Sequence, residues 1–150
     1  SICMVLPARL SIRSVWDRIK ANRFSRSFRL AAEAVNPSGL HLVIVRHAES
    51  VNNVLQFKVE EKLQRGECNA AEATQLWLEG REVDPPLSSR GLQQAQHLAT
   101  HVAPMLRTRG GGETVLLCSP MRRAIETIRP LVAALDARCA VHPLAYEIGG

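Results

Sequence analysis

The chain has 150 residues, of which 46% are hydrophobic and 22% charged, and its formal net charge is +5. This length and composition indicate one globular domain, and no apolar run approaches the roughly 18 residues that a membrane span needs. The excess positive charge comes from the first 38 residues, which hold seven basic and two acidic side chains. The high pI therefore does not indicate a nucleic-acid partner for the rest of the chain.

Residues 1–38 are interpreted as a basic N-terminal arm. Apolar side chains recur at helical spacing over residues 10–35, with Arg and Lys between them, which predicts a basic amphipathic helix. This helix either packs on the domain or belongs to a targeting or membrane-surface segment. The turn residues 36–39 (Asn-Pro-Ser-Gly) then mark the start of a second unit, residues 39–150.

The first predicted element of the second unit is a buried strand from Leu40 to Arg46. Its run of Leu, Val and Ile is typical of a parallel strand, and ligands bind at the carboxyl ends of such strands in open α/β sheets. Arg46 and His47 are therefore expected at a ligand-binding edge. Residues 50–64 are predicted to be helical at least in part, and residues 65–83 to be polar and irregular.

A second helix is predicted after residues 84–87 (Asp-Pro-Pro-Leu), which cannot be helical because each proline restricts the residue before it. Ser88 or Ser89 can serve as its N-cap, and apolar positions then recur every three to four residues. Pro104 is expected to bend or end this helix.

Two further strands, residues 114–118 and residues 137–142, are predicted on either side of a third helix that runs toward Leu135. Ser119-Pro120 predicts the start of that helix, as an N-cap followed by proline at the first helical position. The alternation of strands and helices favours a parallel sheet with right-handed crossovers.

The four cysteines have neither Cys-x-x-Cys nor metal-ligand spacing, and Cys118 is expected to be a small buried hydrophobe. We interpret this usage as that of a reducing, intracellular compartment. A cytoplasmic location is expected, with an organelle as the alternative if the basic arm is part of a targeting segment.

Four segments of the second unit, in order along the chain, have a common family resemblance. Residues 46–53 are Arg-His-Ala-Glu-Ser-Val-Asn-Asn, and residues 84–95 are Asp-Pro-Pro-Leu-Ser-Ser-Arg-Gly-Leu-Gln-Gln-Ala. Residues 119–127 are Ser-Pro-Met-Arg-Arg-Ala-Ile-Glu-Thr, and residues 144–147 are Leu-Ala-Tyr-Glu. The ordered set resembles the histidine phosphatase superfamily, the phosphoglycerate mutase-like group, and the resemblance covers about residues 40–150.

The resemblance implies metal-independent chemistry on a phosphate ester. His47 would attack phosphorus and form a phosphohistidine, Arg46 and Arg123 would bind the phosphoryl oxygens, and Asn53 would add a neutral donor. Glu147 would protonate the leaving alkoxide and then deprotonate the water that cleaves the phosphoenzyme. The implied substrate is a small phosphorylated molecule, and no metal or other cofactor is implied.

Other residues of the four segments, and the remaining histidines, are assigned structural or surface roles. Arg122 is expected to be a solvated surface charge, in contrast to Arg123 in the first turn of its helix. The further residues expected to serve turns, packing, close backbone approach or the surface are Asp84, Leu87, Gly91, Gln94, Asn52, His41, His97, His101 and His142.

Two departures from the family pattern bear on activity. Ala48 replaces the usual Gly, a small-for-small change that is compatible with activity. The family's second catalytic His, which follows the acidic residue, has no counterpart before Gly150. Residues 1–150 therefore resemble the N-terminal part of the catalytic domain, and alone they are expected to have little phosphatase activity.

The predicted fold is a three-layer α/β/α sandwich with a mainly parallel sheet, incomplete at its C-terminal side. The predicted function is metal-independent hydrolysis of phosphate esters through phosphohistidine. Residues 146–150 (Tyr-Glu-Ile-Gly-Gly) differ from the Asn-Glu-Arg pattern of the mutases, which favours a phosphatase. The alternatives are phosphoryl transfer of the phosphoglycerate mutase type and a catalytically inactive phosphate-binding or regulatory protein. No oligomeric state is assigned.

Overall fold

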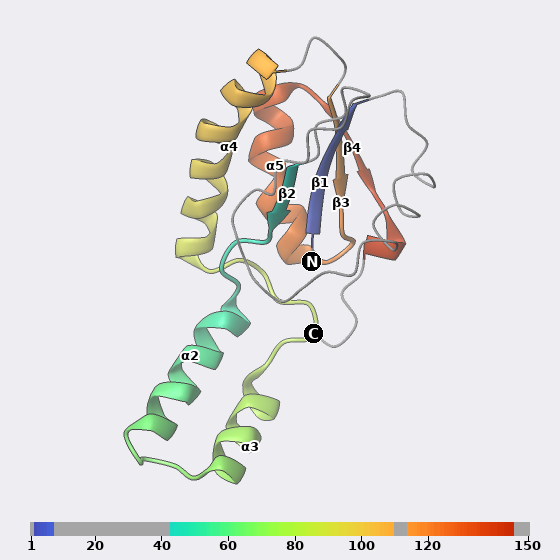
Figure 1. Cartoon of the computed structure of the whole chain (residues 1–150). Coiled ribbons are helices and arrows are strands. Elements are labelled where there is room, and N and C mark those ends of the chain that lie inside the picture. Colours follow the sequence, from blue (N-terminus) through green and yellow to red (C-terminus); the bar gives the residue numbers. More distant parts are fainter. Residues whose placement is uncertain (1, 8–42, 110–113, 146–150) are drawn as a thin grey trace.

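The computed structural model is a mixed α/β fold, and it describes residues 2–7, 43–109 and 114–145 (Figure 1). The helix predicted over residues 10–35 and the boundary predicted at residues 36–39 lie outside the described residues, so the division of the chain at residue 38 stays a prediction. The described elements are, in chain order, β1 (Ile2–Pro7), β2 (Val43–Arg46), α2 (Val51–Gln64), α3 (Ala70–Gly80), α4 (Ser89–Arg109), β3 (Thr114–Cys118), α5 (Arg122–Leu135), β4 (Arg138–Val141) and the short 3₁₀ helix η1 (Pro143–Ala145).

The described strands form one four-stranded sheet in the order β2-β1-β3-β4. β1 is antiparallel to both of its neighbours, with Met4 opposite Ile44 in β2 and opposite Leu117 in β3. Only β3 and β4 pair in parallel among these strands. The prediction of a mainly parallel sheet is therefore wrong for the described strands. The reason is that β1, a continuous apolar run assigned above to the basic arm, lies between two strands that were expected to follow one another.

The carboxyl ends of the strands that were predicted from the sequence nevertheless lie at one edge of the sheet. Because β2 and β3 are each antiparallel to β1, they run in the same direction, and β4 runs with β3. The carboxyl ends of these three strands therefore lie at one edge of the sheet. His47 follows β2 at this edge and Ser119 follows β3, where ligands bind in open α/β sheets.

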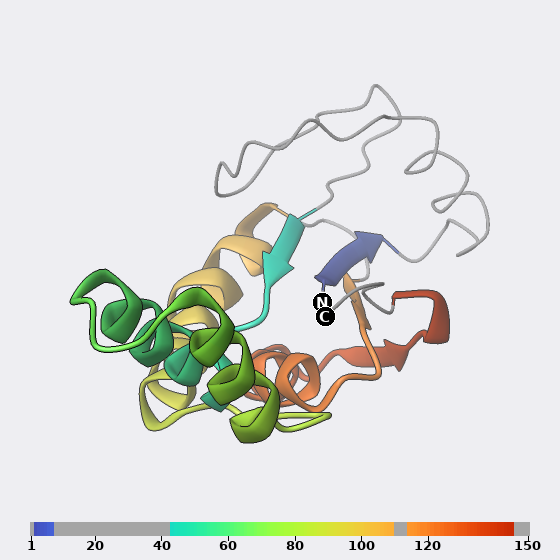
Figure 2. The same cartoon turned by 90° about the horizontal axis from the view of Figure 1, so that it is seen from below.

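α4 and α5 pack side by side on one face of the sheet, whereas α2 and α3 form a helical hairpin that projects away from it (Figures 1 and 2). The second helical layer of the predicted sandwich is not seen in the described part of the chain. None of the described helices is long and apolar enough to cross a membrane. Small and aliphatic side chains fill the core between the helices and the sheet, and Cys118 is completely buried there as predicted. The core residues are Ala99, Ala103, Leu106, Leu116, Cys118, Met121, Ala124, Ile128 and Leu131.

The two helices of the projecting hairpin both begin with a reciprocal cap. In α2, the Ser50 hydroxyl accepts from the Asn53 N–H and the Asn53 side chain accepts from the Ser50 N–H, which confirms the helix predicted there. In α3, Asn69 and Glu72 form the same arrangement. The prediction that residues 65–83 are irregular is thus wrong for residues 70–80, and the missed signal is the Asn-x-x-Glu spacing that starts a helix.

Of the two helices that cover the sheet, α5 begins later than predicted. α5 begins at Arg122 with Met121 as N-cap, rather than at Ser119, and Met121 provides no side-chain cap. The cap comes from Asp84, whose carboxylate oxygens accept the Arg122 N–H at 2.9 and 3.2 Å. α4 continues through Pro104 to Arg109, so this proline does not end the helix.

The start of α4 lies against the loop that follows β2. The Ser88 N–H donates to the Glu49 carbonyl at 2.9 Å, and the Val51 N–H donates to the Pro86 carbonyl at 3.1 Å. The Ser88 hydroxyl caps α4 by accepting the Gly91 N–H at 3.0 Å, as the sequence predicts. A Cβ at Gly91 would lie 2.0 Å from the Glu49 carbonyl oxygen. Glycine is therefore required at this position by space, which confirms the predicted close backbone approach.

Gly91→Ala is expected to destabilise the protein, because the atom it would meet, the Glu49 carbonyl oxygen, is part of the backbone and cannot rotate away. The free energy of unfolding should fall by about 1–3 kcal/mol or more, the scale for overpacking a rigid site. Gly80→Ala is the matched control, because its Cβ would meet the flexible end of Leu55 at 3.0 Å. Urea unfolding of both variants gives the comparison, and equal losses at the two positions would contradict the close approach at Gly91.

Candidate active site

His47 directly follows β2, and the backbone of the next residue fixes its ring. Nδ1 of His47 lies 2.7 Å from the carbonyl oxygen of Ala48. Because a carbonyl oxygen can only accept a hydrogen bond, Nδ1 is the nitrogen that carries the proton, and the lone pair of the neutral ring is on Nε2. This arrangement leaves Nε2 as the ring nitrogen with an available lone pair.

The surroundings of His47 favour its neutral form. Partial burial lowers the pKa of His47 from its ordinary value of 6.5, and the hydrogen bond to Ala48 opposes this effect. The positive charges of Arg123 and Arg46 lower the pKa further. These surroundings therefore favour the uncharged ring of His47, which is the state in which imidazole acts as a nucleophile.

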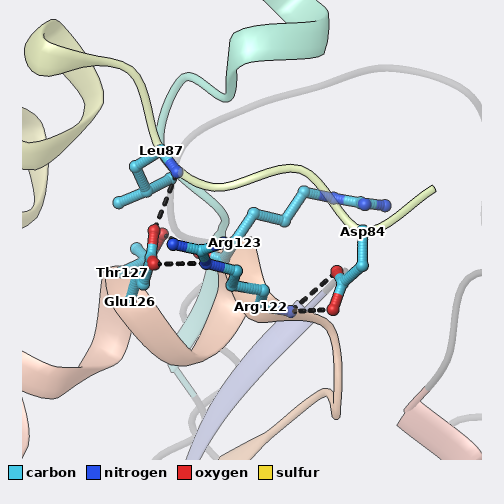
Figure 3. A network of polar contacts seen from close by, with 6 residues as sticks. All are labelled: Asp84, Leu87, Arg122, Arg123, Glu126 and Thr127. Atoms are coloured by element: carbon cyan, nitrogen blue, oxygen red, sulfur yellow. Dashed lines mark hydrogen bonds and ion pairs between the residues drawn. The ribbon is translucent and has the colours of Figure 1, made fainter. Parts of the chain in front are cut away.

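The adjacent arginines at the start of α5 lie in different environments. Arg123 is only 8% exposed, and its charge acts on His47. The Arg122 side chain is 56% exposed, and its Nε donates to Oε1 of Glu126 at 2.8 Å (Figure 3). The predicted contrast between Arg122 at the surface and Arg123 is confirmed. The ion pair between Arg122 and Glu126 was not predicted.

Glu126 links the first turns of α5 to the segment before α4 (Figure 3). Its Oε2 accepts the Leu87 N–H at 2.8 Å, while Oε1 accepts from Arg122. Burial alone would raise the pKa of Glu126, but the bond from Leu87 and the bond and charge of Arg122 outweigh it, so the pKa is lowered. Together with Asp84 on the Arg122 N–H, this network holds the turn that carries Arg123.

The other three predicted site residues are Arg46, Asn53 and Glu147. Arg46 is exposed at the end of β2. Oδ1 of Asn53 accepts from both the N–H and the hydroxyl of Ser50 at 3.0 Å, so Nδ2 is the atom of Asn53 that can donate to a phosphoryl group. Glu147 lies outside the described residues. The roles of these three residues stay predictions.

Thr127 and Gln94 contact the loop after β2 in a way that was not predicted. Thr127 is 2% exposed, and its hydroxyl accepts the Ala48 N–H at 2.9 Å and donates to the Arg123 carbonyl at 2.6 Å. Oε1 of Gln94 accepts the Glu49 N–H at 2.9 Å. The two bonds to the loop join residues 79 and 45 positions apart, so no local pattern in the sequence indicates them.

Several of the residues that were expected to have structural or surface roles are found in such positions. The Asn52 side chain exchanges two hydrogen bonds with the backbone of Glu82, at 2.8 and 3.0 Å, and Leu87 is buried. His97 and His101 are exposed on α4, whereas His41 is outside the described residues. Within the described part of the chain, no group of three or more His, Cys, Asp or Glu side chains could hold a metal ion.

A comparison with protein families agrees with this geometry. The chain matches the family model described as "Histidine phosphatase superfamily (branch 1)" over residues 42–149. The chain belongs to the histidine phosphatase superfamily. No curated protein and no solved structure matches it. Membership of the superfamily implies phosphoryl-transfer chemistry through a histidine, and it confirms the resemblance read from the four segments.

Arg123→Gln is expected to raise the pKa of His47, because removal of a nearby positive charge makes the protonated ring less unfavourable. Between the old and the new pKa, a larger fraction of His47 is then charged and unable to act as a nucleophile. Arg122→Gln is the matched control and should leave the pKa unchanged. An NMR titration of the His47 ring in the three proteins measures the shift. A response to Arg122 as large as the response to Arg123 would mean that the two arginines have been assigned in the wrong order.

Proposed function

We propose that His47 of this chain is the nucleophile in a metal-independent hydrolysis of phosphate monoesters that passes through a phosphohistidine. The observation that supports this most directly is the bond from Nδ1 of His47 to the Ala48 carbonyl, which leaves Nε2 as the nucleophilic atom. A second support is the buried guanidinium of Arg123, whose charge acts on the same ring. A neutral nucleophile beside a fixed cation suits attack on a dianionic phosphoryl group.

In the proposed first step, the Nε2 lone pair of His47 forms a bond to phosphorus while the bond from phosphorus to the alkoxide oxygen breaks. Glu147 gives its proton to that oxygen. The ring keeps its proton on Nδ1 and becomes positively charged, and the Ala48 carbonyl stabilises this charge through the hydrogen bond of 2.7 Å. Arg46, Arg123 and Nδ2 of Asn53 bind the phosphoryl oxygens.

In the proposed second step, water attacks phosphorus and the bond from phosphorus to Nε2 breaks. The electron pair of that bond returns to the ring, and the Glu147 carboxylate takes the proton of the water. Inorganic phosphate leaves, and His47 and Glu147 are restored to their starting states. The proposed substrate class is a small phosphorylated molecule.

The test is phosphorylation of the purified chain by phosphoramidate, a small donor that transfers its phosphoryl group to imidazole. We expect an acid-labile, base-stable phosphoryl group on Nε2 of His47, detected by mass spectrometry after digestion and by ³¹P NMR. His41, His97, His101 and His142 are internal controls. Equal labelling of these histidines, or label on Ser50 or Ser119, would contradict the proposed nucleophile.

The fate of phosphorylated His47 separates the related functions. Release of inorganic phosphate to water supports a phosphatase. Transfer to an added phosphorylated three-carbon acid, without release to water, supports a mutase. A chain that binds inorganic phosphate, detected as a shift of the His47 NMR signals, but that never forms phosphohistidine is an inactive phosphate-binding protein.

Arg123→Ala is expected to lower the rate of phosphorylation of His47 by about 10²–10³, the scale for loss of one group that stabilises charge in the transition state. Arg122→Ala should change the rate little, because the Arg122 side chain is exposed and its ion pair is with Glu126. Both rates can be followed by quenching the phosphoramidate reaction at intervals. A larger loss from Arg122→Ala would overturn the proposed role of Arg123.

A further inference from the structure

Both peptide groups that flank the α-carbon of Ala48 are held by side chains of the helical layer. The N–H of the first group, that of Ala48, donates to Oγ1 of Thr127 in α5 at 2.9 Å. The N–H of the second group, that of Glu49, donates to Oε1 of Gln94 in α4 at 2.9 Å. The backbone of Ala48 is therefore fixed on both sides, and by two different helices.

The second of these peptide groups also contains the carbonyl that holds the nucleophile. The Ala48 carbonyl accepts from Nδ1 of His47, and the Glu49 N–H of the same group is the donor to Gln94. Hydrogen bonds at the two ends of one peptide group polarise each other, so the bond to Gln94 strengthens the bond to the His47 ring. It also fixes the plane in which the carbonyl oxygen lies.

The bond from Thr127 to the Arg123 carbonyl determines the direction of the bond between Thr127 and Ala48. The Arg123 carbonyl can only accept, so the hydroxyl proton of Thr127 points to it, and the oxygen accepts from Ala48. Thr127 is almost completely buried, so loss of its hydroxyl would leave both of these backbone groups without this partner. One side chain thus joins the loop that carries His47 to the turn that carries Arg123.

We propose that Gln94 and Thr127 are positioning residues that hold His47 with its proton on Nδ1 and its lone pair on Nε2. The inference rests on the phosphoryl-transfer function proposed above. The two side chains act through the backbone of Ala48 and not on the phosphoryl group. In a neutral histidine, the ring nitrogen that donates to a hydrogen-bond acceptor carries the proton, and groups that hold the acceptor in place fix that bond.

The test uses two variants that remove one polar atom each and two matched controls. Gln94→Met keeps the length of the side chain without the amide oxygen. Gln93→Met is its control at the neighbouring exposed position of α4. Thr127→Val keeps the shape without the hydroxyl, and Thr127→Ser keeps the hydroxyl. Two-bond ¹H–¹⁵N correlation spectra of the whole chain show which His47 nitrogen carries the proton. The phosphoramidate reaction shows which nitrogen takes the phosphoryl group.

In the unsubstituted chain and in the two control variants, Gln93→Met and Thr127→Ser, we expect a proton on Nδ1 of His47 and phosphorylation on Nε2. In Gln94→Met and Thr127→Val, we expect both tautomers, some phosphorylation on Nδ1, and a rate on Nε2 lower by about 10- to 100-fold, the scale for loss of an outer-shell partner. If Thr127→Val does not fold, Gln94→Met, on the helix surface, decides the question alone.

The outcomes separate this inference from the proposed function. Unchanged tautomer and rate in Gln94→Met and Thr127→Val would overturn the positioning role while phosphohistidine still formed. A proton on Nε2 in the unsubstituted chain would overturn it as well. If the variants shift the tautomer but no protein in the set becomes phosphorylated, the positioning role stands and the proposed function fails.

Discussion

Four consecutive backbone N–H groups after β2 all have partners within the protein, and these bonds tie the elements around the site to one loop. The buried N–H of Ala48 would cost about 1–3 kcal/mol without a partner, and each of the four groups contacts a different part of the chain. The Glu49 carbonyl in the same loop adds a fifth constraint, because it accepts the Ser88 N–H in the space that Gly91 leaves open. The four N–H groups and their partners are Ala48 with Thr127 in α5, Glu49 with Gln94 in α4, Ser50 with Asn53 in α2, and Val51 with the Pro86 carbonyl before α4.

The same arrangement lets a carboxylate lie close to the site without favouring protonation of His47. Glu126 is one turn along α5 from Arg122, and it accepts from the Arg122 side chain and from the Leu87 N–H. Its charge is thus balanced locally, and the charges that lower the pKa of His47 include the positive ones of Arg123 and Arg46. Two adjacent arginines therefore serve opposite purposes: the exposed one neutralises Glu126, and the buried one provides a cation at the sheet edge. Asp84 likewise caps α5 through the backbone N–H of Arg122 rather than through a pairing with Arg123.

The sequence predicted what depends on local pattern and short motifs. The strands that end at Arg46 and Cys118, the helix after Ser50 and the helix after Ser88 follow from apolar runs, periodicity and caps. The place of Arg123 in the first turn of a helix was predicted as well, whereas its burial was not. The start of α5 was wrong because Asp84, 38 residues away, supplies the cap that Ser119 was expected to supply. β1 was missed because pairing with β2 and β3 is a long-range property of a short apolar run. The contacts of Gln94 and Thr127 could not be predicted, since side-chain bonds to a distant backbone leave no periodic trace.

Ala48, which stands where the resemblance described above leads us to expect Gly, shows how this chain accommodates a larger side chain within its most constrained loop. Among the described residues other than glycine, only Asp136 has a positive φ, so the backbone at position 48 does not require glycine for its conformation. The methyl group of Ala48 must also fit among its neighbours, and it is buried in a small cluster with Leu87 and Ala95. Leu87 comes from the segment held by Glu126, and Ala95 follows Gln94 on α4. The added methyl group therefore packs between the two segments whose polar groups already hold the loop, so the departure adds apolar contact at the point where the orientation of His47 is set.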